Sequence, residues 1–184
     1  TFGLKKDHAG IVDKYSGALV DVDQDIPAEA YYVPNNGGYD IYILSNDVIY
    51  APVDSSMLFK DMAALQTVDA RNLDTSRSEN FVDLFRNCTS LTTVNATGWD
   101  TSKVNDLRNA FRTCSKLQEV KGITSWNVSE VTDMYCTFYD CDGMVNLDLS
   151  GWNTGKVTRL DYAIANCDNL ETVNATGWNL TSLN

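Results

Sequence analysis

The sequence predicts an α/β solenoid, with a parallel sheet on one side and short helices on the other, and two observations support it. The first is a repeat: Leu65, Leu91, Leu117, Met144 and Leu170 follow one another at intervals of 26, 26, 27 and 26 residues. The second is that one part of each repeat has strand periodicity and another has helical periodicity. Units of this length bury a continuous core only against one another, so we expect stacked coils.

A bulky apolar residue occupies the same position in every repeat, and we call these residues the Trp column. In the third repeat this position comes one residue later than in the others. The column consists of Leu73, Trp99, Trp126, Trp152 and Trp178. Trp126 comes nine residues after Leu117, whereas the other members come eight after their leucine or methionine, which puts an extra residue near 121–123. The column could be an aromatic stripe for sugar binding, but a position that accepts leucine favours the core.

The two parts of each repeat predict a strand followed by a helix. Apolar and polar residues alternate in Val94-Asn-Ala96 and in Leu147-Asp-Leu149, as in a half-buried strand. Steps of three, four and three then place four apolar residues on one helical face, namely Val104, Leu107, Phe111 and Cys114 in the second repeat. Residues that could cap these helices stand just upstream: Thr101, Ser102, Ser129 and Thr154.

The chain divides into a β-rich N-terminal region, residues 1–53, and a solenoid, residues 54–184, of about five repeats with the last incomplete. We read the first region as a cap or the end of an upstream domain. Tyr39–Ser45 and Val48–Tyr50 predict a hairpin, and 34–38 predicts a loop. Its tyrosines, for which core packing is favoured over a binding cluster, are Tyr31, Tyr32, Tyr39, Tyr42 and Tyr50.

The ends and the charge set expectations about partners. The chain does not begin with methionine and stops within a repeat, so we expect either a fragment of a longer protein or a C-terminal edge that another chain covers. The covering chain would be a second copy in a homo-oligomer or a neighbouring protein. The net charge of −11 argues against nucleic acid and anionic membrane surfaces. No run of eighteen apolar residues exists, so membrane insertion is not expected.

The cysteines and acidic residues predict neither a metal site nor a cofactor. Cys88, Cys114, Cys141 and Cys167 share one repeat column, which favours a ladder of reduced, buried thiols, and Cys136 stands outside it. A zinc site is poorly supported, because there is no CxxC pair and the single histidine is His8. Residues 21–25 resemble the start of a calcium loop, but the required glycine and glutamate are missing, which favours a solvated acidic loop. We expect no catalysis.

Two segments also carry a family resemblance. Leu147–Thr158 and Val131–Cys141 resemble the repeat of the BspA-like leucine-rich-repeat surface proteins, of bacterial and lactobacillus type. The resemblance covers roughly residues 54–184. It implies a leucine-rich-repeat solenoid at a cell surface, with adhesion as the usual role, occasional occurrence in phage virions, and no enzyme activity.

The candidate binding residues are polar side chains on the exposed face of the expected sheet. They are Thr67, Asp69, Thr93, Asn95, Glu119, Lys121, Asn146, Asp148, Thr172 and Asn174. The alternative is a merely solvated strand face. We therefore expect an extracellular, cell-surface adhesion module that recognises a protein or glycan through this sheet. The alternative function is a structural or receptor-binding component of a phage virion, such as a tail fibre or tip.

Overall fold

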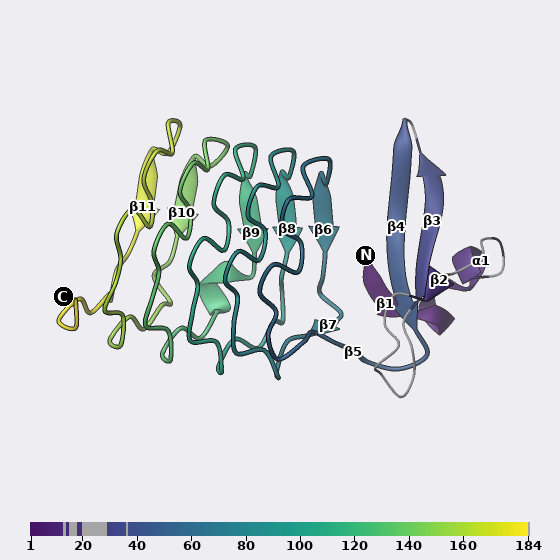
Figure 1. Ribbon diagram of the computed structural model, residues 1–184, viewed down its shortest axis with the longest axis horizontal. Helices are drawn as coiled ribbons and strands as arrows, with labels where there is room; N and C mark the ends of the chain where they lie inside the picture. The colour runs from purple at the N-terminus through teal and green to yellow at the C-terminus, as the bar shows by residue number, and fades with distance from the viewer. Residues whose placement is uncertain (13, 15–17, 20–28, 36, 184) are drawn as a thin grey trace.

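The computed structural model describes residues 1–12, 14, 18–19, 29–35 and 37–183, and it consists of a small N-terminal sheet followed by a row of stacked coils (Figure 1). The coils advance along the long axis of the molecule, and the N-terminal sheet stands at one end of the row. No helix in the described part of the chain is both long and apolar enough to cross a membrane.

The N-terminal sheet has the strand order β1-β4-β3-β2, in which β1 runs parallel to β4 and the other neighbours are antiparallel. Two short helical turns follow the first strand. The elements are β1 (Phe2–Leu4), η1 (Lys5–His8), α1 (Ala9–Val12), β2 (Ala18–Leu19), β3 (Glu29–Asn35) and β4 (Gly38–Ser45).

The hairpin predicted around residues 46–47 is wrong. β5 (Ile49–Tyr50) does not pair with β4 but lies parallel to β7 (Leu73–Asp74). This pairing joins the N-terminal region to the first coil of the solenoid. The hairpin lies one element earlier, where β3 and β4 pair as far as Asn35 and Gly38, in the segment predicted as a loop. Asn-Gly is a strong hairpin signal because such turns need positive φ, and Gly37 has φ 100°.

The coils stack in parallel and in the predicted register. Corresponding strand residues differ by 26, as in the pairs Thr67↔Thr93 and Thr93↔Glu119. The strands form two sheets, β6-β8-β9 and β10-β11. They are β6 (Thr67–Asp69), β8 (Thr93–Asn95), β9 (Glu119–Lys121), β10 (Asn146–Asp148) and β11 (Thr172–Asn174). The break follows β9, where the extra residue is taken up by Gly122 at φ 87° and the 3-10 helix η2 (Ile123–Ser125).

The expected short helices are absent: η2 is the one helical segment in residues 54–183, so the fold is a mostly β, parallel-sheet solenoid and not α/β. The segment from Phe81 to Cys88 shows why. Alternate N–H groups bond to carbonyls of the next coil, as Asp83 does to Arg108 and Phe85 to Ala110, so they cannot form helical i→i−4 bonds. Residues with positive φ also recur at equivalent positions of every coil, for example Asp83 and Asn109, and prevent a right-handed helix.

The apolar stripe itself is confirmed as core, although its backbone is not helical. Val104, Leu107, Phe111 and Cys114 are all completely buried or nearly so. Two of the four residues expected as helix caps serve the stacking of coils instead, since the Thr101 hydroxyl donates to the Asn127 carbonyl at 3.1 Å and the Thr154 hydroxyl to the Asn179 carbonyl at 3.0 Å. A spacing of three and four can therefore arise from successive tight turns as well as from a helix.

Two aromatic columns run through the core, and the Trp column is confirmed as core rather than a sugar-binding stripe. The rings of Trp99, Trp126, Trp152 and Trp178 stack with centroids 5.8, 6.3 and 6.4 Å apart. Phenylalanine rings form a second stack beside them, at 4.7 to 5.4 Å: Phe59, Phe85, Phe111 and Phe138. Offset aromatic stacking adds to area burial, so these columns link each coil to the next.

The cysteine column is also confirmed as free thiols. Each thiol donates to a carbonyl of the preceding coil, for example Cys88 to Phe59 at 2.9 Å and Cys114 to Phe85 at 3.1 Å. Burial raises the pKa of Cys88 to about 11, which keeps the thiol protonated and able to donate. Cys136 stands outside the column, buried and unpaired as predicted, at a left-handed position shared with Asp83 and Asn109.

Candidate binding surface

The strands place the ten predicted residues in two rows on the outer side of the sheets. The first row holds the first residue of each strand and the second row holds the third residue. Between them lies an inward-facing residue, which is buried in β6, β8, β9 and β10: Val68, Val94, Val120 and Leu147. All ten predicted side chains are exposed or half-buried, so the outward orientation is as expected.

The rows are not continuous through paired strands. Six of the ten residues lie on β6-β8-β9 and four on β10-β11, and the structure gives no pairing between β9 and β10. The five strands nevertheless stand side by side in one row of coils (Figure 1). The surface is therefore a polar strip that is interrupted once, between β9 and β10; it is called the strip below.

Most of the second row builds corners of the coil. The side-chain oxygens of Asp69, Asn95, Asp148 and Asn174 each accept a hydrogen bond from the backbone N–H two residues on. Such Asx turns let the chain leave the strand and turn toward the Trp column. Lys121, in the coil with the extra residue, is the exception in this row. Four of the ten candidates thus have a structural reason to be Asp or Asn.

The charges on the strip are partly neutralised. The Arg71 guanidinium donates two hydrogen bonds to Asp69, at 2.9 and 2.7 Å, and holds the pKa of that carboxyl below its ordinary value. Lys121 lies 3.9 Å from Glu119, two residues earlier on the same strand. Backbone and side-chain hydrogen bonds from Ser150 lower the pKa of Asp148, so it carries its full charge at neutral pH.

The side chains left to meet a ligand are mainly those of the first row, with Lys121. Thr67, Thr93 and Glu119 align directly across three strands. In the other sheet the Thr172 hydroxyl donates to the Asn146 side-chain oxygen at 2.6 Å. Hydroxyls, amides and one carboxylate at regular intervals can hydrogen-bond an extended polar ligand, but they hold no nucleophile–base pair.

Two hollows on the described surface are both lined by residues other than the ten candidates. One, of about 220 Å³, lies where the N-terminal sheet meets the first coil and is lined by residues such as Gly3, Asp47 and Asn72. The other, more open and of about 380 Å³, lies beside Arg71 and Asp100. The described residues also contain no group of three or more His, Cys, Asp or Glu placed to hold a metal ion. The acidic segment 21–25 lies outside the described residues.

The N-terminal tyrosines divide between core and surface. Tyr31 is buried, and its hydroxyl donates to Glu29 at 2.8 Å, which agrees with core packing. Tyr32 and Tyr39 are exposed on one face of the β3–β4 hairpin, 50% and 66% respectively. The tyrosines are thus neither all packed in the core of the N-terminal region nor gathered in one binding cluster.

A second group of surface aromatics was not anticipated from the sequence. Tyr135 and Tyr139 precede Cys141 in the turn segment of one coil, and Tyr162 follows in the next. The available signal was position: Tyr135 and Tyr139 each come directly after a residue of the apolar stripe, Met134 or Phe138, and both are half-buried at the surface. This group lies on a different segment of the coil from the strands.

Comparison with known proteins gives one family. Residues 53–178 match the family described as "Mycoplasma protein of unknown function, DUF285". No curated protein and no solved structure matches the chain.

Proposed function

The chain belongs to the family described as Mycoplasma protein of unknown function, DUF285, and from that premise we propose that it is a non-catalytic extracellular adhesion module. It recognises a protein or glycan on a host or neighbouring cell through the exposed strip of its repeat sheets. The matched segment covers the coils that carry this strip.

The observation that carries the proposal is the alignment of outward polar side chains in register. Thr67, Thr93 and Glu119 occupy equivalent positions on three paired strands, above buried valines. Solenoids present extended surfaces of this kind to their partners. A flat array of hydrogen-bonding groups suits a long polar ligand better than a small molecule, which would need a concave pocket.

The resemblance of the repeats to the BspA-like surface proteins supports the proposed placement at a cell surface. The segment Val131–Cys141 carries that resemblance, and it supplies buried Met134, Phe138 and Cys141 to the core. The resemblance allows the virion role as well. The description of the matched family names a cellular organism, which supports the cell surface over the virion.

The experiment is a binding screen against arrays of glycans and extracellular-matrix proteins, followed by variants of the strip. Glu119→Gln with Asp148→Asn removes two charges while keeping the Asx turn at Asp148, since Asn95 and Asn174 make the same turn. We add Thr93→Val, which removes a hydroxyl without changing shape. A ligand bound by the strip is expected to lose about tenfold or more in affinity.

The matched control is Asp7→Asn with Glu79→Gln, which changes the net charge equally at two exposed positions outside the strip. Binding that weakens with the strip variants alone supports the proposal. If binding is unchanged by the strip variants, or falls equally with the control, then the strip is not the binding surface. Failure to bind any array component would overturn the adhesion proposal for these ligand classes.

A further inference from the structure

Three tyrosines and two arginines form a surface cluster on the turn segments of the later coils, here called the Tyr–Arg patch: Tyr162 and Arg159, which are exposed, and Tyr135, Tyr139 and Arg112, which are half-buried. Tyr162 is 63% exposed and meets the other two rings edge-on, with centroids 6.3 and 6.4 Å away. The neighbouring residues Met134 and Phe138 are fully buried and fix the backbone from which the rings project.

The arginines of the patch lie over its aromatic faces. The Arg159 guanidinium is 4.0 Å from the centroid of Tyr135, and that of Arg112 is 5.3 Å from the centroid of Tyr139. The Tyr139 hydroxyl accepts a hydrogen bond from the Asn166 amide at 2.7 Å. These contacts hold the rings and guanidinium groups in place before any partner arrives, which lowers the entropy lost on binding.

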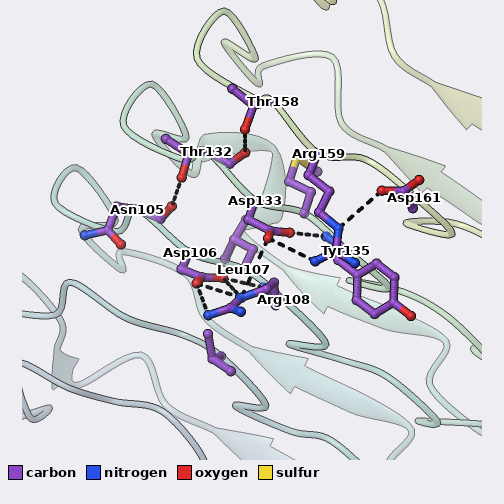
Figure 2. Close-up of polar contacts among 12 residues, drawn as sticks. Asn105, Asp106, Leu107, Arg108, Thr132, Asp133, Tyr135, Thr158, Arg159 and Asp161 are labelled. Atoms are coloured by element: carbon purple, nitrogen blue, oxygen red, sulfur yellow. Dashed lines mark hydrogen bonds and ion pairs between the residues drawn. The ribbon is translucent and has the colours of Figure 1, made fainter. Parts of the chain in front are cut away.

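A row of alternating charges borders the patch. Figure 2 shows Arg108 between Asp106 and Asp133, and Arg159 between Asp133 and Asp161. Arg108 lies 2.7 Å from Asp106 and 3.8 Å from Asp133, and Arg159 lies 3.5 Å from Asp133 and 3.2 Å from Asp161. Each guanidinium has five N–H donors, so donors remain for a partner.

The residue types of the patch indicate a protein partner, and its balance of charges indicates a second copy of this chain. Tyrosine and arginine are enriched where protein interfaces concentrate their binding energy. The chain carries a net charge of −11, so two copies repel each other over most of their surface. In the patch and its border, the three arginines Arg108, Arg112 and Arg159 balance the charges of three aspartates, so these six side chains add no net negative charge to the contact.

We propose that the Tyr–Arg patch is the contact surface of a symmetric dimer of this chain. In a two-fold contact the same patch meets itself, so it must be self-complementary. The order carboxylate, guanidinium, carboxylate, guanidinium, carboxylate meets that condition, because a reversed copy shifted by one position sets each guanidinium against a carboxylate. The patch does not overlap the strip on the sheets, so a dimer presents two strips and gains avidity.

The test is analytical ultracentrifugation of the chain over concentrations on the order of 1 to 200 μM. The unchanged protein is expected to pass from monomer to dimer in this range. Tyr162→Ser removes an exposed ring with little effect on the core, and Arg159→Glu puts a third carboxylate beside Asp133 and Asp161. Each is expected to weaken the dimer about tenfold or more.

The matched control is Tyr39→Ser, which removes an equally exposed tyrosine from the β3–β4 hairpin. A dimer weakened by the patch variants but not by the control supports the proposal. A chain that stays monomeric throughout overturns it, as does a dimer that withstands both patch variants. A dimer lost with Tyr39→Ser alone assigns self-association to the hairpin face and also overturns it.

Discussion

At the residue scale, the Trp column shows how one extra residue in a coil changes the hydrogen bonding of a single side chain. The indole N–H groups of Trp99, Trp152 and Trp178 donate to carbonyls of the preceding coil at 2.9 to 3.0 Å. The Trp126 indole N–H is buried, yet among the described residues it has no acceptor. Trp126 belongs to the coil with the extra residue, and η2 lies just before it. The insertion thus preserves ring stacking while it loses one hydrogen bond.

This difference predicts unequal costs for the same substitution. Trp152→Phe removes a donor and leaves the Ile123 carbonyl short of one partner, whereas Trp126→Phe removes no hydrogen bond. Both rings are buried and stacked, so the loss of apolar contact is similar. We expect Trp152→Phe to lower the free energy of unfolding by about 1 kcal/mol more than Trp126→Phe. Urea denaturation measures this, and equal losses would contradict it.

Asp83 is the most buried carboxylate of the coils, and two cations compensate it. Its carboxylate lies 2.8 Å from Lys60 and 3.2 Å from Arg86. Burial disfavours the charged form, but the hydrogen bonds from Lys60 and Asn109 and the charge of Arg86 outweigh it and lower the pKa of Asp83. One carboxylate oxygen has no partner among the described residues. The group therefore stabilises the fold only while ionised.

The pH dependence follows from the direction of that shift. Because the pKa is lower in the folded state, the stabilisation is complete above the ordinary value of 3.8 and is lost as the pH falls through the folded value. Asp83→Asn is expected to cost about 1 to 3 kcal/mol at pH 7, with a smaller difference from the unchanged protein near pH 3. Asn109 occupies the equivalent left-handed position, so the backbone tolerates asparagine.

Urea unfolding of both proteins at the two pH values measures the effect. Asp61→Asn is the control, because Asp61 is an exposed aspartate that also has positive φ. It should cost less than Asp83→Asn at pH 7. A gap between Asp83→Asn and the unchanged protein that stays constant down to pH 3 would show that ionisation of Asp83 is not the cause.

At the element scale, the repeat and its register could be predicted from the sequence, but the backbone of half the coil could not. Equivalent residues do pair at intervals of 26, with 27 across the third coil, as Asp106↔Asp133 shows. Burial alone repeats every three or four residues in Val104, Leu107 and Phe111, whether the chain forms a helix or successive tight turns. The choice depends on N–H bonds to the next coil, which are interactions between coils and leave no local signal.

The candidate strip was predictable as an exposed surface, because alternation along a strand decides which side chains point outward. What alternation could not show is that Asp69 and Asp148 build turns and that Arg71 neutralises one of them. The Tyr–Arg patch lies where the predicted helix would have been. Its rings come together because coils stack, so Tyr135 and Tyr162 meet across 27 residues of sequence.

The coil with the extra residue also restricts its neighbour. The Thr124 carbonyl, which belongs to η2, lies close to Gly151. A Cβ added to Gly151 would be 2.2 Å from the Thr124 oxygen. Gly151→Ala must push two backbones apart, so we expect it to cost about 1 to 3 kcal/mol. The control is Gly10→Ala, where a Cβ meets no atom within 4 Å. Thermal unfolding followed by circular dichroism compares them, and equal midpoints would contradict the close approach.

At the scale of the whole molecule, the N-terminal sheet covers the first coil. Phe2 packs edge-on against Phe59, with centroids 6.2 Å apart, and so extends the phenylalanine column by one ring. The Asn72 side chain donates to the Phe2 carbonyl at 3.2 Å, and Ile49 of β5 joins the core of the solenoid. In a solenoid each coil is stabilised mainly by its neighbours, so the sheet takes the place of a preceding coil.

This arrangement predicts that a substitution in the N-terminal sheet destabilises the first coil but not the distant coils. Phe2→Ala should remove about 1 to 2 kcal/mol of local stability from the first coil, because Phe59 loses its outer neighbour. Amide hydrogen exchange measures it residue by residue. The Phe59 amide, bonded to the Leu84 carbonyl, should exchange faster, whereas the Leu149 amide, bonded to Asn174, should not change.

Phe2→Leu provides the control, since it keeps an apolar side chain against Phe59 and should retain most of the protection. Equal acceleration at Phe59 and Leu149 would mean that the coils unfold as one unit rather than one after another. Unchanged exchange at Phe59 would mean that the sheet does not support the coil it covers. Faster exchange confined to the first coil is the outcome that stabilisation by nearest neighbours requires, because Leu149 lies coils away from the substituted ring.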